Sequence, residues 1–319
     1  MRNLSTLAWR VYDAPTKPWH GVVADTEGDD SVYVMRVERR DGVSQLTLAH
    51  ITPTGTEELA VLEVAAAPPH VPDVADFRLL ADGGSSVNHM PAICVIGSGG
   101  DIVLMPVDEE ASAPAEVVGS VDQGILAAAW SPEEDVLVLI TGGEKRLIVM
   151  TREFEVMSET MLSTEAFGDD QPVNVGWGSK STQFHGSEGK QAAMAAANAP
   201  EESDPRGPLV PEDDGLPRIS WRGDGAFFVT SSAEASNDAV HRILRTYTRT
   251  GTLSATSDRS VRGISHVLAC RPTGNLIATT QRMGGPWAPG RHGRHDVVFF
   301  ERNGLRHGEF SLREEHGSV

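Results

Sequence analysis

The fold is decided by a stretch that begins Ala129-Trp130-Ser131-Pro132 and continues through two short apolar runs, Val136 to Ile140 and Arg146 to Met150, which a Gly142-Gly143 turn separates. Short runs rich in Val, Ile and Leu, bounded by Gly, Pro and Asp, are typical of β-strands joined by tight turns. The stretch therefore predicts a buried strand, a turn, a second apolar strand, another turn and a third strand.

Two later parts of the sequence repeat this pattern. The second copy begins Ser220-Trp221-Arg222-Gly223-Asp224-Gly225 and the third begins Ala269-Cys270-Arg271-Pro272-Thr273-Gly274, and each continues into two apolar runs. Weaker copies precede them at Val32 to Ile51 and Ala92 to Val107. A strand–turn unit that recurs along the chain is the pattern of a propeller blade, which is a four-stranded antiparallel sheet.

We therefore predict an all-β chain, an incomplete WD-repeat-like β-propeller of about five recognisable four-stranded blades, without the strict Gly-His…Trp-Asp signature. The side chains before the first turns, such as Trp221 and Cys270, are expected to pack between neighbouring blades. The approximate blade ranges are 22–65, 74–121, 124–161, 172–258 and 263–312.

The predicted domain covers residues 1–319 as one propeller, truncated before the ring closes, because no partner blade follows the fifth. Residues 179–217 are predicted to be a loop insertion within the fourth blade. This insertion passes through an Ala-rich part, residues 191–199, into a part rich in Pro and acidic residues, for which the composition favours a mobile loop.

Charge is distributed unevenly along the chain. Residues 1–217 contain 13 Lys and Arg against 36 Asp and Glu, whereas residues 218–319 contain 14 Arg and no Lys against 9 acids. The total of −18 opposes nucleic-acid binding, which depends on cation contacts with phosphates. The arginine-rich third could form a basic face, but arginines scattered over outer strands are the favoured interpretation.

The cellular compartment follows from three features of the sequence. Cys94 and Cys270 each lie in an apolar run outside any Cys-x-x-Cys or Cys/His cluster, which predicts two core residues and a reducing compartment. The chain has no run long enough for a membrane helix and no secretory signal at Met1-Arg2-Asn3-Leu4. We therefore expect a cytoplasmic protein, with the nucleus as a second location, that makes no membrane contact.

The string Phe184-His185-Gly186-Ser187-Glu188-Gly189-Lys190 is the most suggestive motif of the insertion. It fails as a phosphate-binding loop, because Phe184 stands where the first Gly is required and Gln191 where Ser or Thr is required. Two interpretations remain, a loop that contacts another protein and an ordinary polar surface loop.

Catalytic and metal-binding patterns are weak. The string His292-Gly293-Arg294-His295-Asp296 lies in a Gly/Pro-rich context that does not fix ligands, so we predict no metal and no cofactor. The sequence has no G-x-S-x-G, H-E-x-x-H or G-x-G-x-x-G motif. A Ser–His–Asp triad assembled from distant loops remains open.

Three strings carry a family resemblance that extends over essentially the whole chain. Residues 173–193, from Val173-Asn174-Val175-Gly176-Trp177-Gly178 through Lys190, together with Trp221 to Phe228 and Asp296 to Gly308, resemble the scaffold-subunit family of the Elongator complex, also called the IKAP family. The resemblance implies the N-terminal propeller portion of a much longer scaffold that supports modification of the wobble uridine of tRNA.

The resemblance also implies partners and a division of labour. The carboxymethyl-type chemistry would belong to a radical-SAM and acetyltransferase-like subunit, a second WD-repeat subunit would be another partner, and tRNA would be reached only through the complex. The chain itself is then no enzyme; the alternative is a propeller-fold hydrolase with a central-channel active site. The candidate protein-binding residues are Trp177, Lys180, Gln183, Phe184, His185 and Lys190.

Overall fold

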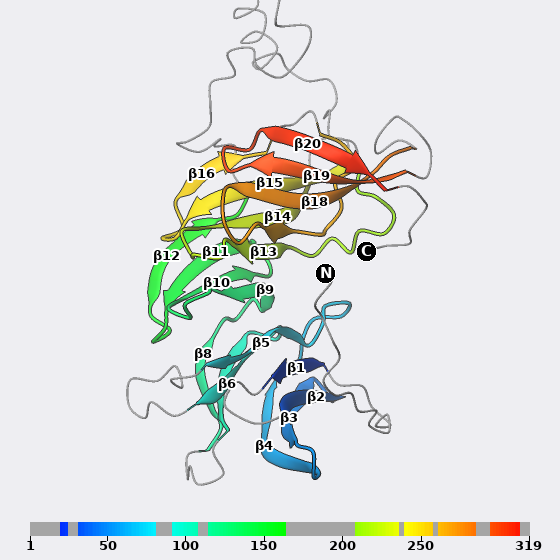
Figure 1. Ribbon diagram of the computed structural model, residues 1–319. Coiled ribbons are helices and arrows are strands. Elements are labelled where there is room, and N and C mark those ends of the chain that lie inside the picture. The colour runs from blue at the N-terminus through cyan, green and yellow to red at the C-terminus, as the bar shows by residue number, and fades with distance from the viewer. Residues whose placement is uncertain are drawn as a thin grey trace, which may run out of the picture. The chain divides into compact units, whose positions relative to one another are not determined.

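The computed structural model describes residues 20–24, 31–80, 91–107, 114–163, 208–235, 239–257, 261–284 and 294–312. These residues form twenty strands in five four-stranded antiparallel sheets, and in each sheet the strands follow one another in sequence order (Figure 1). The prediction of an all-β protein with five four-stranded blades is confirmed. Among these residues, no helix is long and apolar enough to cross a membrane.

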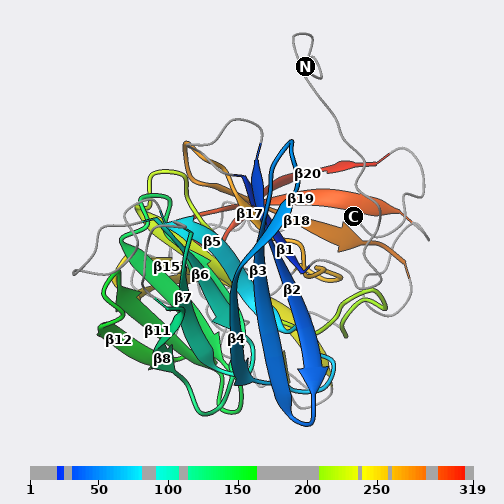
Figure 2. The ribbon, with the colours of Figure 1, turned by 90° about the horizontal axis from the view of Figure 1, so that it is seen from below.

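The first two sheets contain eight strands. The first consists of β1 (Gly21–Ala24), β2 (Val32–Arg40), β3 (Val43–Ile51) and β4 (Thr56–Ala65). The second consists of β5 (Val74–Leu80), β6 (Ala92–Gly97), β7 (Asp101–Pro106) and β8 (Glu116–Ser120). The strand order of the first sheet is β1-β2-β3-β4, and Figure 2 shows β2 and β3 side by side.

The remaining three sheets contain twelve strands. The third sheet consists of β9 (Ile125–Trp130), β10 (Val136–Thr141), β11 (Arg146–Thr151) and β12 (Val156–Met161). The fourth consists of β13 (Arg218–Trp221), β14 (Phe227–Ala235), β15 (Val240–Thr248) and β16 (Leu253–Thr256). The fifth consists of β17 (Ala269–Cys270), β18 (Leu276–Arg282), β19 (His295–Glu301) and β20 (Arg306–Ser311).

The chain divides into two compact units, residues 1–120 and residues 121–319. In the first unit, buried side chains of the first two sheets form one core, which includes Met35, Leu46, Ile93 and Val103. Four consecutive residues are buried along β7 and three along β2, so both faces of these strands are covered there. Apolar burial between paired sheets therefore holds this unit together.

In the second unit, each pair of neighbouring sheets shares a core. Val138, Val149 and Phe228 belong to the core between the third and fourth sheets. Phe227, Val298 and Phe300 belong to the core between the fourth and fifth. The two faces of β14 thus serve two different cores, which is why Phe227 and Phe228 are adjacent in sequence and are both fully buried.

The predicted packing of Trp221 and Cys270 between blades is confirmed. The Trp221 indole N–H donates to the carbonyl oxygen of Ala129, 3.2 Å away in the third sheet. The Cys270 backbone N–H donates to Ser220 Oγ of the fourth sheet, 2.9 Å away. Equivalent positions on β13 and β17 therefore link the fourth sheet to the third and the fifth sheet to the fourth.

A glycine in the turn after the third strand allows a second close approach between sheets. Gly251 has a φ of 88°, and a Cβ there would lie 2.5 Å from Ser158 Oγ of the preceding sheet. Gly304 has a φ of 84°, and a Cβ there would fall inside contact distance of the Thr256 carbonyl. Both the backbone conformation and the lack of space require glycine at these turns.

Candidate functional site: a charged anchor between three strands

The predicted protein-binding residues, Trp177, Lys180, Gln183, Phe184, His185 and Lys190, lie outside the residues that the structure describes. They belong to residues 164–207, in the connection between β12 and β13. The structure does describe residues 208–217, where this connection reaches β13. We call residues 208–217 the anchor segment.

The anchor segment is fixed by its backbone and by one apolar side chain. The Leu209 N–H donates to the Val240 carbonyl, 2.8 Å away at the start of β15. The side chain of Val210 is buried, and the Asp213 N–H closes a turn onto the Val210 carbonyl at 3.0 Å. The Pro- and acid-rich composition led us to expect a mobile loop here, and in the structure the anchor segment makes these defined contacts.

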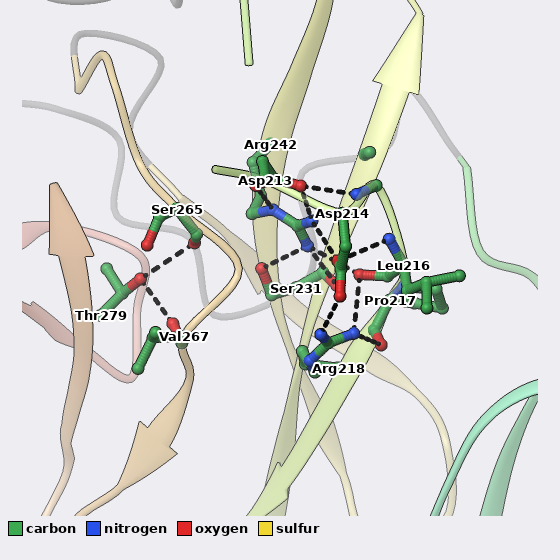
Figure 3. Close-up of polar contacts among 12 residues, drawn as sticks. Asp213, Asp214, Leu216, Pro217, Arg218, Ser231, Arg242, Ser265, Val267 and Thr279 are labelled. Atoms are coloured by element: carbon green, nitrogen blue, oxygen red, sulfur yellow. Dashed lines mark hydrogen bonds and ion pairs between the residues drawn. The ribbon is translucent and has the colours of Figure 1, made fainter. Parts of the chain in front are cut away.

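Three consecutive acids of the anchor segment each pair with an arginine of a different strand (Figure 3 shows the second and third pairs). Glu212 pairs with Arg282 of β18, Asp213 with Arg242 of β15, and Asp214 with Arg218 of β13. The arginines come from the fourth and fifth sheets. The segment is therefore tied to two sheets through charge-assisted hydrogen bonds, which are the stronger kind.

The Asp213–Arg242 pair is the buried centre of this arrangement. Both side chains are fully buried, and Arg242 Nε lies 2.7 Å from an Asp213 carboxylate oxygen. Arg242 Nη1 also donates to the Leu216 carbonyl at 3.1 Å and to the Ser231 carbonyl at 3.3 Å (Figure 3). The guanidinium thus keeps partners in place of water, as a buried charge requires.

Asp214 lies closer to solvent and ionises readily. Burial acts to raise the pKa of Asp214, but the hydrogen bond from Arg218, a backbone hydrogen bond from Leu216 and the attraction of Arg218 outweigh it, so the pKa lies below its usual range. Asp214 therefore remains a carboxylate and keeps its pair with Arg218 at any ordinary pH.

Asp213, Asp214 and His266 together have the composition of a metal site. One ligand atom from each residue lies within 4.8 Å of the others. However, both carboxylates already accept hydrogen bonds from Arg242 and Arg218, which a cation would have to displace against their positive charges. The donor set fits an ion-pair network and does not fit a metal centre.

The cavity beside this network is too small for a substrate. Its volume is about 20 Å³, enough for roughly one water molecule, and His266, Ser265 and Gln281 are among the lining residues. Ser265 Oγ bonds to Thr280 Oγ1, and within the described residues no histidine reaches it. A hydrolase would need a nucleophile that is hydrogen-bonded to a base, and the described residues around this cavity do not supply such a pair.

Arginines of the C-terminal third serve as structural partners. Eight of them form ion pairs with described carboxylates, and several of these carboxylates come from earlier in the chain, such as Asp135 with Arg249. Arg245 of β15, nearly fully buried, pairs with Glu234 of β14 in the same way. The uneven charge along the sequence is thus partly balanced by contacts in space.

Comparison with known proteins gives a consistent result. Residues 1–319 match the family model described as the ELP1 first N-terminal beta-propeller. Elongator complex protein 1 of Mus musculus is 34% identical over 323 residues, which cover 98% of this chain and 21% of that protein. The Saccharomyces cerevisiae protein of the same name is 35% identical over 240 residues, 67% of this chain and 17% of that protein.

A solved structure also matches at low identity. It is that of Chaetomium thermophilum Sqt1 bound to the N-terminus of the ribosomal protein L10, with 15% identity and a TM-score of 0.47. The match covers 93% of this chain and 63% of the other.

Proposed function

The chain belongs to the Elongator complex protein 1 family, as its first N-terminal β-propeller, and from this premise we propose that it is a non-catalytic scaffold module of the Elongator complex. The chain spans about a fifth of the length of the curated relatives it matches. The activity of the complex is therefore ascribed to other parts of it. The match of the family model over all 319 residues is the observation that carries the proposal.

The described side chains support a scaffold in preference to an enzyme. The titratable groups that converge in the second unit, Asp213, Asp214 and their arginines, hold an internal connection in place. Their charges are neutralised by one another, so they are not arranged for proton transfer to a substrate. We propose that another subunit, of the radical-SAM and acetyltransferase type, performs the carboxymethyl-type modification of the tRNA wobble uridine.

We propose that residues 177–190 contact other Elongator subunits, among them the catalytic subunit and a second WD-repeat subunit. The anchor segment supports this idea indirectly, because it fixes the point at which the connection returns to β13. The protein would work in the cytoplasm and also in the nucleus, and would reach tRNA only through the complex.

The contact is tested by co-purification from cells that carry the substitutions in the family's complete protein. The test variant combines Lys180→Glu and Lys190→Glu with Phe184→Ala and His185→Ala. Recovery of the other subunits is expected to fall about tenfold, corresponding to about 1.4 kcal/mol of binding free energy. Wobble-uridine modification, measured by mass spectrometry of tRNA nucleosides, should fall with it.

The control is Arg271→Glu combined with Phe310→Ala, an exposed cation and an exposed aromatic side chain of the fifth sheet. This pair changes charge and ring area in the same direction, by half as much and elsewhere, and should leave recovery unchanged. Undiminished recovery of all subunits with the test variant would refute the proposed contact.

A further inference from the structure

A groove separates the outer parts of the third and fourth sheets. Its volume is about 600 Å³, within the range of binding sites for peptides and small ligands. One side is formed by β12 and the residues after it, the other by β15, β16 and the turn between them. The lining residues are Ser158, Thr160, Met161, Ser163, Tyr247, Thr250, Gly251, Thr252 and Leu253.

Two hydrogen bonds join β12 and the residues after it to the fourth sheet beside the groove. Ser158 Oγ donates to the Thr250 carbonyl at 2.8 Å, and Ser163 Oγ donates to a Glu234 carboxylate oxygen at 3.1 Å. Gly251 fits against Ser158 because it has no Cβ. One bond in the middle of β12 and one just after its end thus fix this strand relative to the fourth sheet, so a ligand would meet a preformed site.

The strand β12 is an edge strand with free backbone groups. Among the residues that the structure describes, it is the last strand of its sheet and pairs only with β11. The Leu162 N–H donates to the Lys145 carbonyl on the β11 side at 2.9 Å. Because strand residues alternate, the backbone N–H and C=O groups of Met161 and Glu159 point to the free side.

This edge lacks the usual protection against pairing. Nine large apolar side chains are exposed among the described residues, and three of them, Val156, Met157 and Met161, lie on β12. Edge strands are normally protected by Pro, Lys or other charges, but β12 has no Pro or Lys, and its one charged residue is Glu159. By contrast, β4 carries three glutamates.

The surroundings of β12 are acidic. Residues 121–163 contain eight Asp and Glu against three Lys and Arg. Of these cations, Arg146 lies between Glu144 and Glu159, and Lys145 Nζ donates to the Ala233 carbonyl. Glu153 and Glu155 are exposed and have no ion-pair partner among the described residues. A ligand of this edge should therefore carry positive charge.

We propose that the groove binds an extended segment of a partner protein, which adds to β12 as a fifth strand and alternates apolar side chains with Lys or Arg. The free N–H and C=O groups of Glu159 and Met161 would supply the main-chain hydrogen bonds. Apolar side chains of the segment would cover Met157 and Met161, and its cations would face Glu153 and Glu155. None of residues 177–190 is among the residues of this surface, so the proposal adds a contact to the scaffold role.

The test uses the full 319-residue chain and a fluorescein-labelled peptide of alternating lysine and valine, KVKVKVK, with EVEVEVE as its charge-reversed counterpart. Fluorescence anisotropy should show saturable binding of the lysine peptide and at least tenfold weaker binding of the glutamate peptide. Amide hydrogen exchange, measured with the lysine peptide bound, should slow at Glu159 and Met161.

The blocking variant is Met161→Pro, which removes one free N–H without removing a bond to β11. The matched control is Val61→Pro, another exposed residue on an edge strand. The Ala66 N–H donates to the Gly42 carbonyl, so by the same alternation the Val61 N–H points away from β3. Affinity should fall at least tenfold in Met161→Pro and stay unchanged in Val61→Pro.

If Met161→Pro fails to fold, the double variant Met157→Lys with Met161→Lys replaces it. Its two lysines repel the lysine peptide at the same edge, and the affinity should fall by the same factor. The proposal is overturned by any of three results: equal binding of both peptides, no slowing at Glu159 and Met161, or equal losses in test and control variants. Sedimentation that shows a dimer dissolved by Met161→Pro would also overturn it, because the occupant would then be a second copy. No other subunit enters this test, so its outcome is separate from that of the co-purification.

Discussion

Single residues in this protein matter most where charge is buried. Asp213 and Arg242 are both fully removed from solvent, and each is the other's counter-ion. The sequence could not predict this pair, since 29 positions separate the two residues and no local pattern links them. Trp221 and Cys270, in contrast, were predictable, because their packing follows from a position that recurs in the three clearest repeats.

Breaking the buried pair should be costly. Arg242→Met leaves the Asp213 carboxylate buried without a counter-ion and is expected to lower the free energy of unfolding by about 3 kcal/mol or more. Arg242→Met combined with Asp213→Asn should cost less than the sum of the single changes, by about 1 to 3 kcal/mol. Urea denaturation measures all three variants. Arg40→Met, which removes an exposed partner of Glu38, is the control and should change stability by less than about 0.5 kcal/mol.

Asp76 on β5 should make stability depend on pH in the opposite sense to most carboxyl groups. Burial raises its pKa to about 6, against the opposing effects of a hydrogen bond from the Phe77 N–H and of Arg78. The pKa of Asp76 in the folded state lies above its pKa in the unfolded chain. The stabilisation that this group contributes is therefore complete below pH 3.8 and is lost as the pH rises through about 6.

Asp76→Asn removes this ionisation. The variant should be more stable than the parent at pH 7.5 by about 1 to 2 kcal/mol, a figure reduced for partial exposure, and nearly equal to it at pH 4. Thermal or urea unfolding at both pH values measures the difference. If the parent and the variant differ in free energy of unfolding by the same amount at both pH values, ionisation of Asp76 is not the cause of the difference.

At the scale of the elements, the recurring strand–turn unit made the sheets predictable. The runs Val136 to Ile140 and Leu276 to Thr280 lie within β10 and β18, because each is bounded by turn residues and buries its side chains. The anchor segment was not predictable from composition. Its Pro and acidic residues favour a mobile loop when isolated, and only arginines on β13, β15 and β18 reverse that preference.

The contribution to stability of the close approach between a turn and the preceding sheet can be measured by comparing alanine substitutions at two glycines of almost equal backbone conformation. Gly304 has a φ of 84° and Gly42 a φ of 85°, but only Gly304 lacks room for a Cβ. Gly42→Ala should cost about 1 kcal/mol, from the left-handed conformation alone. Gly304→Ala should cost about 2 kcal/mol more, as the turn must move away from Thr256. If chemical denaturation shows that Gly42→Ala and Gly304→Ala lose the same free energy of unfolding, the close approach of Gly304 to Thr256 contributes nothing to stability.

For the molecule as a whole, the net charge of −18 opposes binding to nucleic acid. The arginine-rich third offers less basic surface than its sequence suggests, because Arg218, Arg242 and Arg282 already hold carboxylates. At 150 mM salt the 319-residue chain should therefore bind tRNA more weakly than about 10⁻⁴ M, the weak end of non-specific binding. Gel-shift or anisotropy titration measures this, and tight binding that falls steeply with added salt would reveal an available basic face.

The anchor segment has a consequence for the order in which the protein is made. The ribosome synthesises Glu212, Asp213 and Asp214 before any of their arginines, and Arg282 comes 70 residues after Glu212. At about 5 to 20 residues per second, that interval lasts roughly 4 to 14 s. Asp214 gains Arg218 after four residues and Asp213 gains Arg242 after 29, so only Glu212 lacks its arginine for the whole interval. The long connection can be secured only when the fifth sheet has left the ribosome, so translation through β18 sets the earliest moment at which it is fully tied down.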